Sequence, residues 1–402
     1  MFARVLCAAI LIVAFSTAAF SKSTPTYKET ILHSLNDHNG DANPSGGLLM
    51  DASGNLYGTS LSGTLFRLTQ DSSGQWNYSV LCDCGDSNSY GFLAMDQSGN
   101  LYGSNFWNEI DKFSKGTSGQ WSSTLIYAFG GDRGNGPSPL LVDKSGKVYG
   151  TYALGGAFNK GFVFELSDSN GSWTLTDIHD FSGTDGALST LPGKLGGLIM
   201  DSAGSLYGTT ASGGSSTKCA GGCGVVFKLT NQSGIWKEQV LHSFSGGDGS
   251  ASAAALLMDA TGNLYGTTTS GGPAGFGTVF ETYLAGGKWS TRILHNFTNA
   301  NGDGAFPDAT LIMDQSGNLF GTTTAGGGSS ECQVGNVYGC GTVFELTQQN
   351  GTWKESVLER FSGGVNGGFP EGVLIGHDGK LYGAAQAGGR FFMGLIFELS
   401  KM

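Results

Sequence analysis

A short stretch, MDASGNLYG from Met50 to Gly58, contains residue types that bind cations. Asp51, Ser53 and Asn55 alternate along it, and calcium loops present side-chain oxygens in this way. Asp, Asn and Gly also form tight turns, because an Asx side chain accepts backbone N–H groups and Gly tolerates positive φ. The Asp recurs in later copies of the stretch, as Asp51, Asp96, Asp143, Asp201, Asp259 and Asp314. A structural turn fits every copy, including the seventh, which has Gly376 instead. We therefore predict a turn, with calcium as the alternative.

Polar side chains in the loops that join successive copies form a second candidate site. They are Asp41, Asn43, Asp86, Asn88, Asn135, Asp185, Asp248, Asp303 and Asn366. Such a set could bind a cation or a hydroxyl-rich ligand at a channel mouth, or it could consist of solvated turn residues. His38, beside Asp37 and Asp41, is the best candidate for acid–base chemistry. If the protein is an enzyme, His38 and Asp41 are its predicted catalytic residues; otherwise we expect none.

Aromatic residues outside the repeat pattern form a third candidate. Phe106 and Trp107 lie in one variable loop, and Arg390, Phe391 and Phe392 lie in another. Exposed aromatic rings beside polar groups suit stacking on sugars or apolar ligands, whereas burial under the loops is the competing interpretation. Together with Asp41, Asp185, Asp248 and Asp303, these five residues are the predicted ligand-binding residues.

The elements that position these residues follow from seven repeats. The turn glycine of each copy lies 45 residues (Gly54 to Gly99) to 62 residues (Gly317 to Gly379) from the next. Each copy has two short strands, a Gly-rich loop, a third strand such as GTVFELT, and a Trp-led fourth strand such as WKEQVLHSF. Four antiparallel strands per unit, with almost no helical periodicity, predict an all-β, seven-bladed β-propeller.

The two ends of the chain predict how the ring closes. The seventh unit stops after its third strand, LIFELSKM, whereas YKETILHSL at Tyr27 to Leu35 matches the fourth-strand pattern. The N-terminal strand should complete the last blade and remove two free sheet edges. Four of the six histidines share one position of the fourth strand: His33, His179, His242 and His295. Equivalent outer strands are far apart in a ring, so we predict no shared metal ion.

The repeat resembles the GloVer tandem repeat of "choice-of-anchor" bacterial surface proteins. The segment from Asp303 to Thr347, which contains LIMDQSGNLFGTTTAGGG and GTVFELT, is close to a complete copy. The resemblance runs from about Tyr27 to the end of the chain and implies a bacterial surface or secreted protein. It implies no general activity or catalytic set. Family members often carry a C-terminal anchor, and none is recognisable here.

The N-terminus and the cysteines predict export. Arg4 and the apolar run from Val5 to Phe20 indicate a signal peptide over residues 1–21, with an uncleaved anchor as the alternative and a single domain over 22–402. Six further cysteines suggest disulfides. We predict Cys219–Cys223 and Cys332–Cys340, while the state of Cys82 and Cys84 stays open. We expect a secreted or periplasmic monomer with no later membrane span.

The charge of the chain and the variation of its loops narrow the range of possible functions. The net charge of −11 without a Lys/Arg cluster argues against a nucleic-acid partner. Loop length varies on one face only, the variable-loop face, which carries the second-to-third and blade-to-blade connections; the opposite, uniform face carries the short turns. We predict a non-catalytic binding or scaffold protein for an extracellular glycan or protein, without a cofactor. The alternative is an exported polysaccharide lyase or hydrolase with acidic residues at the channel mouth.

Overall fold

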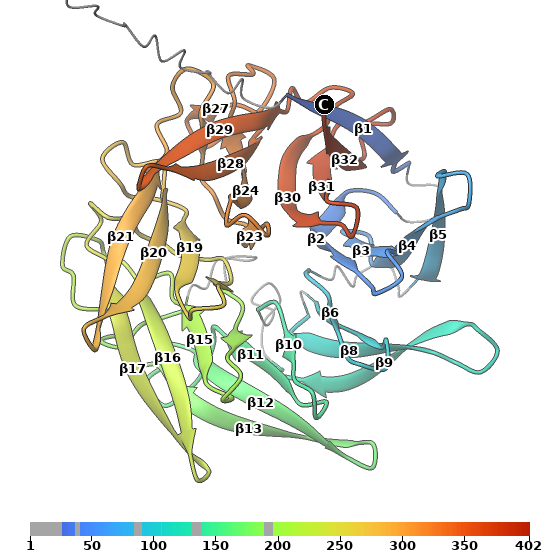
Figure 1. The fold of residues 1–402 in the computed structure, drawn as a ribbon. Coiled ribbons are helices and arrows are strands. Elements are labelled where there is room, and N and C mark those ends of the chain that lie inside the picture. The colour runs from blue at the N-terminus through green and yellow to red at the C-terminus, as the bar shows by residue number, and fades with distance from the viewer. Residues whose placement is uncertain (1–25, 37–40, 84–90, 106, 131–137, 189–195) are drawn as a thin grey trace, which may run out of the picture.

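The computed structural model describes residues 26–36, 41–83, 91–105, 107–130, 138–188 and 196–402. Seven four-stranded antiparallel sheets follow one another around a central axis (Figure 1). In Figure 1 the first strand of each blade lies toward the axis and the fourth lies at the outer edge. The predicted seven-bladed β-propeller is therefore confirmed.

The blades are numbered along the chain. Blade 1 has β2 (Pro44–Met50), β3 (Leu56–Ser60), β4 (Thr64–Gln70) and β5 (Trp76–Asp83). Blade 2 has β6 (Ala94–Met95), β7 (Leu101–Ser104), β8 (Glu109–Lys115) and β9 (Trp121–Ala128). Blade 3 has β10 (Leu141–Val142), β11 (Val148–Tyr152), β12 (Phe162–Ser169) and β13 (Ser172–Asp180). Blade 4 has β14 (Ile199–Met200), β15 (Leu206–Thr209), β16 (Val225–Gln232) and β17 (Ile235–Ser243).

The remaining blades include the ring closure. Blade 5 has β18 (Leu257–Met258), β19 (Leu264–Thr268), β20 (Thr278–Ala285) and β21 (Lys288–Asn296). Blade 6 has β23 (Ile312–Met313), β24 (Leu319–Thr323), β28 (Thr342–Gln349) and β29 (Thr352–Arg360). Blade 7 has β30 (Gly368–Ile375), β31 (Leu381–Ala387), β32 (Leu395–Lys401) and β1 (Tyr27–Ser34). Two small pairs, β22 (Gly304–Ala305) with β25 (Ala325–Gly326) and β26 (Gln333–Val334) with β27 (Val337–Tyr338), lie in the loops around blade 6.

The N-terminal strand closes the ring as predicted. β1 pairs antiparallel with β32, from Tyr27 opposite Lys401 to Ser34 opposite Leu395. The ends of the chain thus share one sheet, which lies at the top of Figure 1. This pairing gives the third strand of blade 7 a partner, so its backbone groups are satisfied as in the other blades.

The core repeats from blade to blade because small and large side chains alternate between facing strands. In blade 6, a Cβ added to Gly321 would lie 2.6 Å from the Phe344 ring and 2.8 Å from Leu311. Phe344 is fully buried, as is the corresponding Phe of most other blades. Only a glycine leaves room for this ring at native packing density, which explains the invariant Gly of the YG or FG pair.

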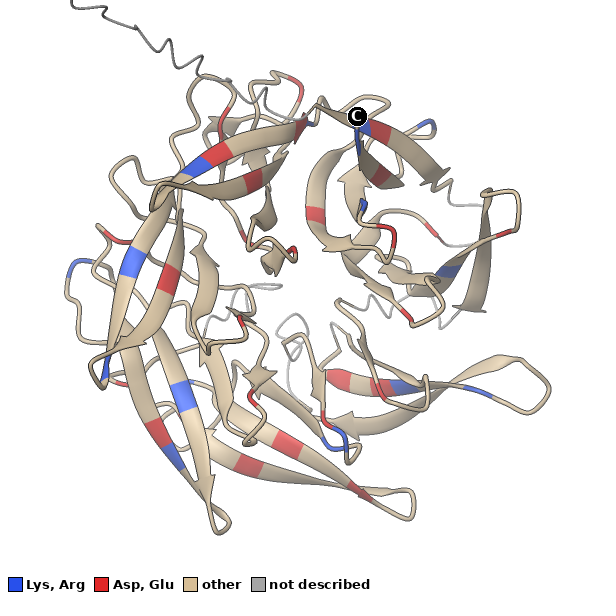
Figure 2. Ribbon diagram, in the orientation of Figure 1, with Lys and Arg blue, Asp and Glu red and all other residues tan. Residues whose placement is uncertain are grey.

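Blades are also joined on the variable-loop face through backbone hydrogen bonds. Phe306 donates its N–H to Phe276 of the preceding blade, and Phe369 donates to Cys340 in the same way. Asn43 and Ala251 occupy the equivalent junctions, and all four residues have φ between 55° and 60°. Asn adopts this left-handed region readily, whereas a bulky Phe does so at a cost. Figure 2 shows Lys and Arg scattered over several blades instead of gathered on one surface.

Candidate functional site

The recurring MDxSGN stretch is a structural turn on the uniform face. Asp51 Oδ1 accepts the backbone N–H groups of Ser53 and Asn55, each at 2.9 Å, and Oδ2 accepts Asn55 Nδ2 and the Tyr57 hydroxyl. Gly54 provides the positive φ of 83°. Burial opposes ionisation of Asp51, but these hydrogen bonds outweigh it and lower the pKa of the carboxyl. In the seventh copy Asp378 accepts the Tyr382 hydroxyl at 2.8 Å, so a shifted carboxylate replaces the missing Asp.

The aspartates of the blade-to-blade loops pair with the histidines of the outer strands. The Nε2–Oδ distances are 3.9 Å for His33–Asp41, 3.4 Å for His179–Asp185, 2.9 Å for His242–Asp248 and 3.5 Å for His295–Asp303. A β-bulge just before each His interrupts the register with the third strand, as between Val163 and Phe164 opposite His179. An extra residue at a bulge re-aims the side chain that follows it, here toward the next loop.

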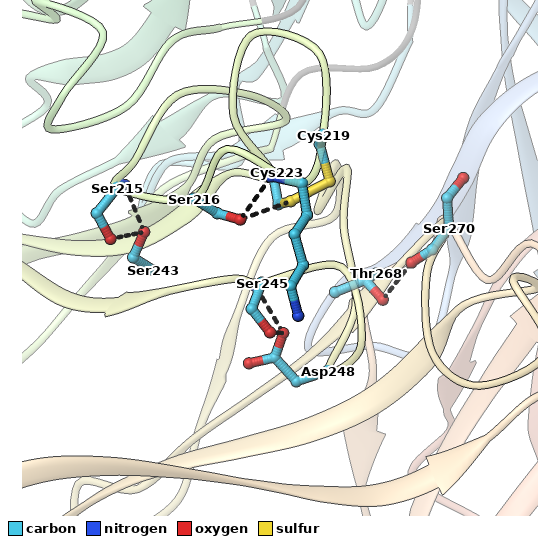
Figure 3. Close-up of a disulfide and its surroundings, with 10 residues drawn as sticks. Ser215, Ser216, Cys219, Cys223, Ser243, Ser245, Asp248, Thr268 and Ser270 are labelled. Carbon is cyan, nitrogen blue, oxygen red and sulfur yellow. Dashed lines mark hydrogen bonds between the residues drawn. A yellow bond between two sulfur atoms is a disulfide. The ribbon is translucent and has the colours of Figure 1, made fainter.

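Each of these aspartates is held inside its own loop. Asp248 accepts the N–H and hydroxyl of Ser245 at 2.7 and 2.9 Å, close to the Cys219–Cys223 disulfide (Figure 3). Burial raises the pKa of Asp248, but the hydrogen bonds from His242 and Ser245 outweigh it and lower the pKa to about 2. Asp185 and Asp303 likewise accept the backbone N–H groups of Ser182 and Thr298. The structure therefore distributes the described aspartates among separate His–Asp pairs instead of bringing them together.

A third carboxylate, which sequence reasoning missed, approaches some of these pairs from the following blade. It is the third residue of the WKE stretch, Glu238 or Glu355; Glu29 holds the same position in blade 7, but there it faces Glu359 instead of a His–Asp pair. Burial and the nearby Asp185 raise the pKa of Glu238 to about 7, and burial and Glu359 raise that of Glu29 to about 8. The repeated Glu was visible in the sequence, but its neighbour belongs to another blade, and no local pattern reveals that contact.

A pocket of about 260 Å³ lies between blades 6 and 7 on the variable-loop face. Its lining combines Asp308, Glu371, Gln386 and Thr324 with the apolar side chains of Val334, Phe369 and Pro370. Asp308 and Glu371 hold equivalent positions directly after a proline, in FPD and FPE, just before or within the inner strands. Sequence reasoning also missed these two residues, although the repeated aromatic–Pro–acid triplet was a usable signal.

A larger hollow of about 460 Å³ lies at the outer edge between blades 3 and 4. It is lined by the Lys147–Glu165 ion pair, Asp177, Trp236 and the exposed Ile235. Its walls include the short β16–β17 turn of the uniform face, where loops do not vary between blades. The pocket between blades 6 and 7 is therefore the stronger candidate for recognition.

The aromatic candidates differ in exposure. Phe391 and Phe392 are 42% and 71% exposed, and the Arg390 guanidinium lies 5.4 Å from the centre of the Phe391 ring. Trp107 is half-buried in a turn in which Asn105 Oδ1 accepts its N–H at 2.9 Å. Phe106, and the catalytic candidate His38, lie outside the described residues. The Arg390–Phe392 segment therefore has the accessible rings that the binding prediction requires.

Both predicted disulfides are present. Cys219–Cys223 and Cys332–Cys340 have S–S distances of 2.05 and 2.08 Å, and each staples a mid-blade loop of the variable-loop face. Cys332 and Cys340 pack into the hydrophobic cluster between blades 6 and 7, together with Phe361 and Leu395. Cys82, in β5, is also disulfide-bonded, while Cys84 lies outside the described residues.

The repeat is matched by a known family model. The Gloeobacter/Verrucomicrobia repeat matches residues 113–334 and 192–402, which together cover well over half of the chain. The chain belongs to the Gloeobacter/Verrucomicrobia repeat family. The resemblance stated from the sequence is thus confirmed, and this repeat forms a four-stranded propeller blade. No curated protein sequence matches the chain.

Solved structures similar to this Gloeobacter/Verrucomicrobia repeat protein share its fold. The WD40 β-propeller domain of Doa1 is 12% identical over 94% of this chain and 98% of its own, with a TM-score of 0.54. YCF48 bound to D1 peptide is 12% identical over 95% and 96%, with a TM-score of 0.53. A fungal alcohol oxidase of the AA5 family, in complex with copper, is 12% identical over 94% and 76%, with a TM-score of 0.58. Enzymes and non-enzymes are both among these propellers, so the fold alone does not determine the function.

The described part of the chain contains no helix of the length and apolarity that a membrane span requires.

Proposed function

We propose that this repeat protein is an exported, non-catalytic propeller that binds a glycan on its variable-loop face. One sugar unit would occupy the pocket between blades 6 and 7. The observation that carries the proposal is the lining of that pocket, where Asp308, Glu371 and Gln386 lie with Phe369 around about 260 Å³. Carboxylate and amide groups bond sugar hydroxyls, and an aromatic ring stacks on the apolar face of the sugar.

The backbone of Phe369 supports a functional role for this pocket. Its φ of 56° lies in the left-handed region, although Asn43 at the equivalent junction shows that a better-suited residue type fits there. A strained bulky residue persists when its side chain does something that a smaller one cannot, and such residues cluster at ligand sites. Phe369 both lines the pocket and packs against the hydrophobic cluster between blades 6 and 7, which supports Phe at this position.

The neighbouring loop offers a surface for further sugar units. Phe391 follows Gln386 of the pocket by five positions, and Val365 in the adjoining loop is 71% exposed. The Gly389 N–H bonds the Gly364 carbonyl at 3.0 Å, so these two loops are fixed beside each other. Exposed rings on a fixed loop bind at low entropic cost. Trp107 and Phe106 remain candidates for a separate contact.

Export rests on the disulfides, on the bacterial repeat family and on the predicted signal segment. The structure has Cys219–Cys223 and Cys332–Cys340 disulfides, and such bonds are common in oxidising compartments and rare in the cytosol.

The test is a glycan array probed with the purified protein and with Phe369→Asn. We expect specific binding by the natural chain and at least about fivefold weaker binding by the variant, because a stacking ring contributes about 1 kcal/mol. The variant also relieves the backbone strain, so its melting temperature should be unchanged or higher. Ala251→Asn is the matched control, since it places Asn at the equivalent positive-φ position at the junction of blades 4 and 5, away from the pocket, and should leave binding unchanged.

Three outcomes would overturn the proposal. An array without binding, combined with capture of a defined extracellular protein, would replace the glycan by a protein partner. Equal glycan affinity of Phe369→Asn and the natural chain would move the site away from this pocket. Glycan cleavage that is lost in Asp308→Asn or Glu371→Gln would show an enzyme instead of a binding protein.

A further inference from the structure

At the outer edge of the ring, where blade 5 meets blade 6, three ligating side chains converge. We propose that His295, Asp303 and Glu355 bind one divalent transition-metal ion. Their ligand atoms lie within 4.8 Å of one another, and no other group of three or more His, Cys, Asp or Glu among the described residues meets this condition. His295 is the penultimate residue of β21, Asp303 lies in the following blade-to-blade loop, and Glu355 belongs to β29. The ion would thus connect two blades.

Two of the ligand atoms lack a hydrogen-bond partner within the protein. His295 Nε2 and Glu355 Oε1 are shielded from solvent and accept or donate no hydrogen bond. The His295 Nε2 to Asp303 Oδ1 distance of 3.5 Å is too long for a good hydrogen bond. Buried polar atoms without partners are costly, and a cation between them would satisfy both.

The ligand Asp303 is already oriented by its own loop. Asp303 Oδ2 accepts the N–H and hydroxyl of Thr298 at 2.8 and 2.7 Å, and Oδ1 accepts the Gly304 N–H at 2.7 Å. Such outer contacts fix a ligating carboxylate and are a regular part of metal sites. The loop does not need to rearrange when the ion binds.

Other blade junctions show how His and Asp are arranged where another residue replaces Glu355. Between blades 4 and 5, Thr291 takes the place of Glu355, and His242 bonds Asp248 directly at 2.9 Å. Between blades 7 and 1, Tyr78 takes that place and stacks on His33 at 3.9 Å. Without the Glu, the His–Asp gap is thus closed at the first junction, whereas at the second, where His33 and Asp41 are 3.9 Å apart, the Tyr78 ring covers the imidazole. Between blades 3 and 4, where Glu238 is present, the His179–Asp185 distance is again longer, at 3.4 Å.

The donor set selects the class of metal. One imidazole nitrogen and two carboxylates suit Zn²⁺ or Mn²⁺, and water would complete the coordination. Ca²⁺ prefers six to eight oxygen ligands and is a poor match. The two carboxylates balance the charge of the ion. Arg360, the nearby cation on β29, is exposed and donates its Nε to the Gly302 carbonyl at 3.0 Å, so it borders the site without ligating.

The experiment measures binding of Zn²⁺, Mn²⁺ and Ca²⁺ to the metal-stripped full chain by titration calorimetry, with the melting temperature as a second readout. We expect Zn²⁺ or Mn²⁺ to bind and to raise the melting temperature, because the ion binds the folded state only. Glu355→Thr, which copies Thr291, should lower the number of bound ions by one or weaken one site at least about tenfold. Since the chain itself uses Thr at this position, the variant should fold.

Two further variants make the result decisive. Glu29→Thr removes the equivalent buried carboxylate at a junction that has Glu359 in place of His, so its metal binding should match that of the natural chain. Thr291→Glu adds the third ligand beside His242 and Asp248 and should add one bound ion. Absence of Zn²⁺ and Mn²⁺ binding at 100 μM ion, or identical binding by Glu355→Thr, would overturn the proposal. Both readouts are independent of glycan binding.

Discussion

Two kinds of carboxylate recur in this propeller, and they have opposite electrostatics. The aspartates of the uniform face, such as Asp51, accept hydrogen bonds from residues two to six positions along the chain, and their pKa is lowered. The glutamates at the outer edge, such as Glu29, are partly buried against the preceding blade, and their pKa is raised. Recurrence alone therefore does not show whether a residue is satisfied. What matters is whether its hydrogen-bond partners belong to the same repeat.

The same contrast separates the two faces of the ring. Turns on the uniform face contain their own hydrogen-bond partners, so every copy is complete by itself. The junctions between blades combine side chains of two units, and these combinations differ: His with Glu, His with Tyr, His with Thr, or Glu with Glu. Variation at the junctions gives some of them chemistry that the others lack.

The largest effect that would test this contrast is expected for Glu29→Gln. The folded carboxyl, with a pKa of about 8, holds a proton that the unfolded chain loses near pH 4.5, so stability falls as pH rises through this window. A neutral Gln removes the decline. We expect the variant to gain about 2 kcal/mol at pH 8, after allowance for solvent screening, and nothing at pH 4.

Chemical denaturation at pH 4, 6 and 8 measures this difference. Glu331→Gln, which removes an exposed carboxylate, serves as the control for net charge. If the natural chain and Glu29→Gln lose stability equally between pH 5 and 8, the outer-edge glutamates are not the buried acids described above.

A smaller effect is expected for Asp314→Ala on the uniform face. Asp314 accepts the N–H groups of Ser316 and Asn318 at 2.8 and 2.9 Å and the Asn318 side chain at 2.8 Å. Loss of these bonds should destabilise the fold by about 1.5 kcal/mol, by analogy with the loss of a capping Asp. Urea denaturation measures the cost. Asp314→Asn keeps one acceptor oxygen and should lose less than half as much; an equal loss would contradict a role as acceptor.

The smallest effect is expected for Asp248→Asn. This carboxylate lies at a blade junction, like the outer-edge glutamates, but its pKa is lowered, like that of the aspartates on the uniform face. Its lowered pKa of about 2 stabilises the folded state above the unfolded pKa of about 4, and this contribution is lost as pH falls toward 2. The variant should lose about 1 kcal/mol at pH 7, since the group is partly exposed. An acid titration of the unfolding free energy should show the two proteins converging near pH 2. A constant difference down to that pH would show that packing, and not charge, stabilises the pair.

The fold was predictable because each repeat contains the residues that specify its own strands and turns. Gly54 and Asp51 specify a turn within nine residues, and the match of Tyr27 to Leu35 with the Trp-led strands specified how the ring closes. The candidate site was less accessible. Phe391 and Phe392 are exposed, as a binding role requires, but the pocket with Asp308 and Glu371 depends on two blades, and so does the group of His295, Asp303 and Glu355.

The sequence by itself determined the number of blades, the turn chemistry of the uniform face and the two disulfides, because each depends on residues close together in the chain or on a repeated pattern. Only the tertiary structure decided which side chains of neighbouring blades meet. That choice depends on the angle between adjacent sheets and on the bulge before each outer-strand His, which aims the side chain at the next loop. Neither leaves a periodic pattern in the sequence, since a contact between blades joins residues far apart in the chain, such as His295 and Glu355, which are 60 positions apart.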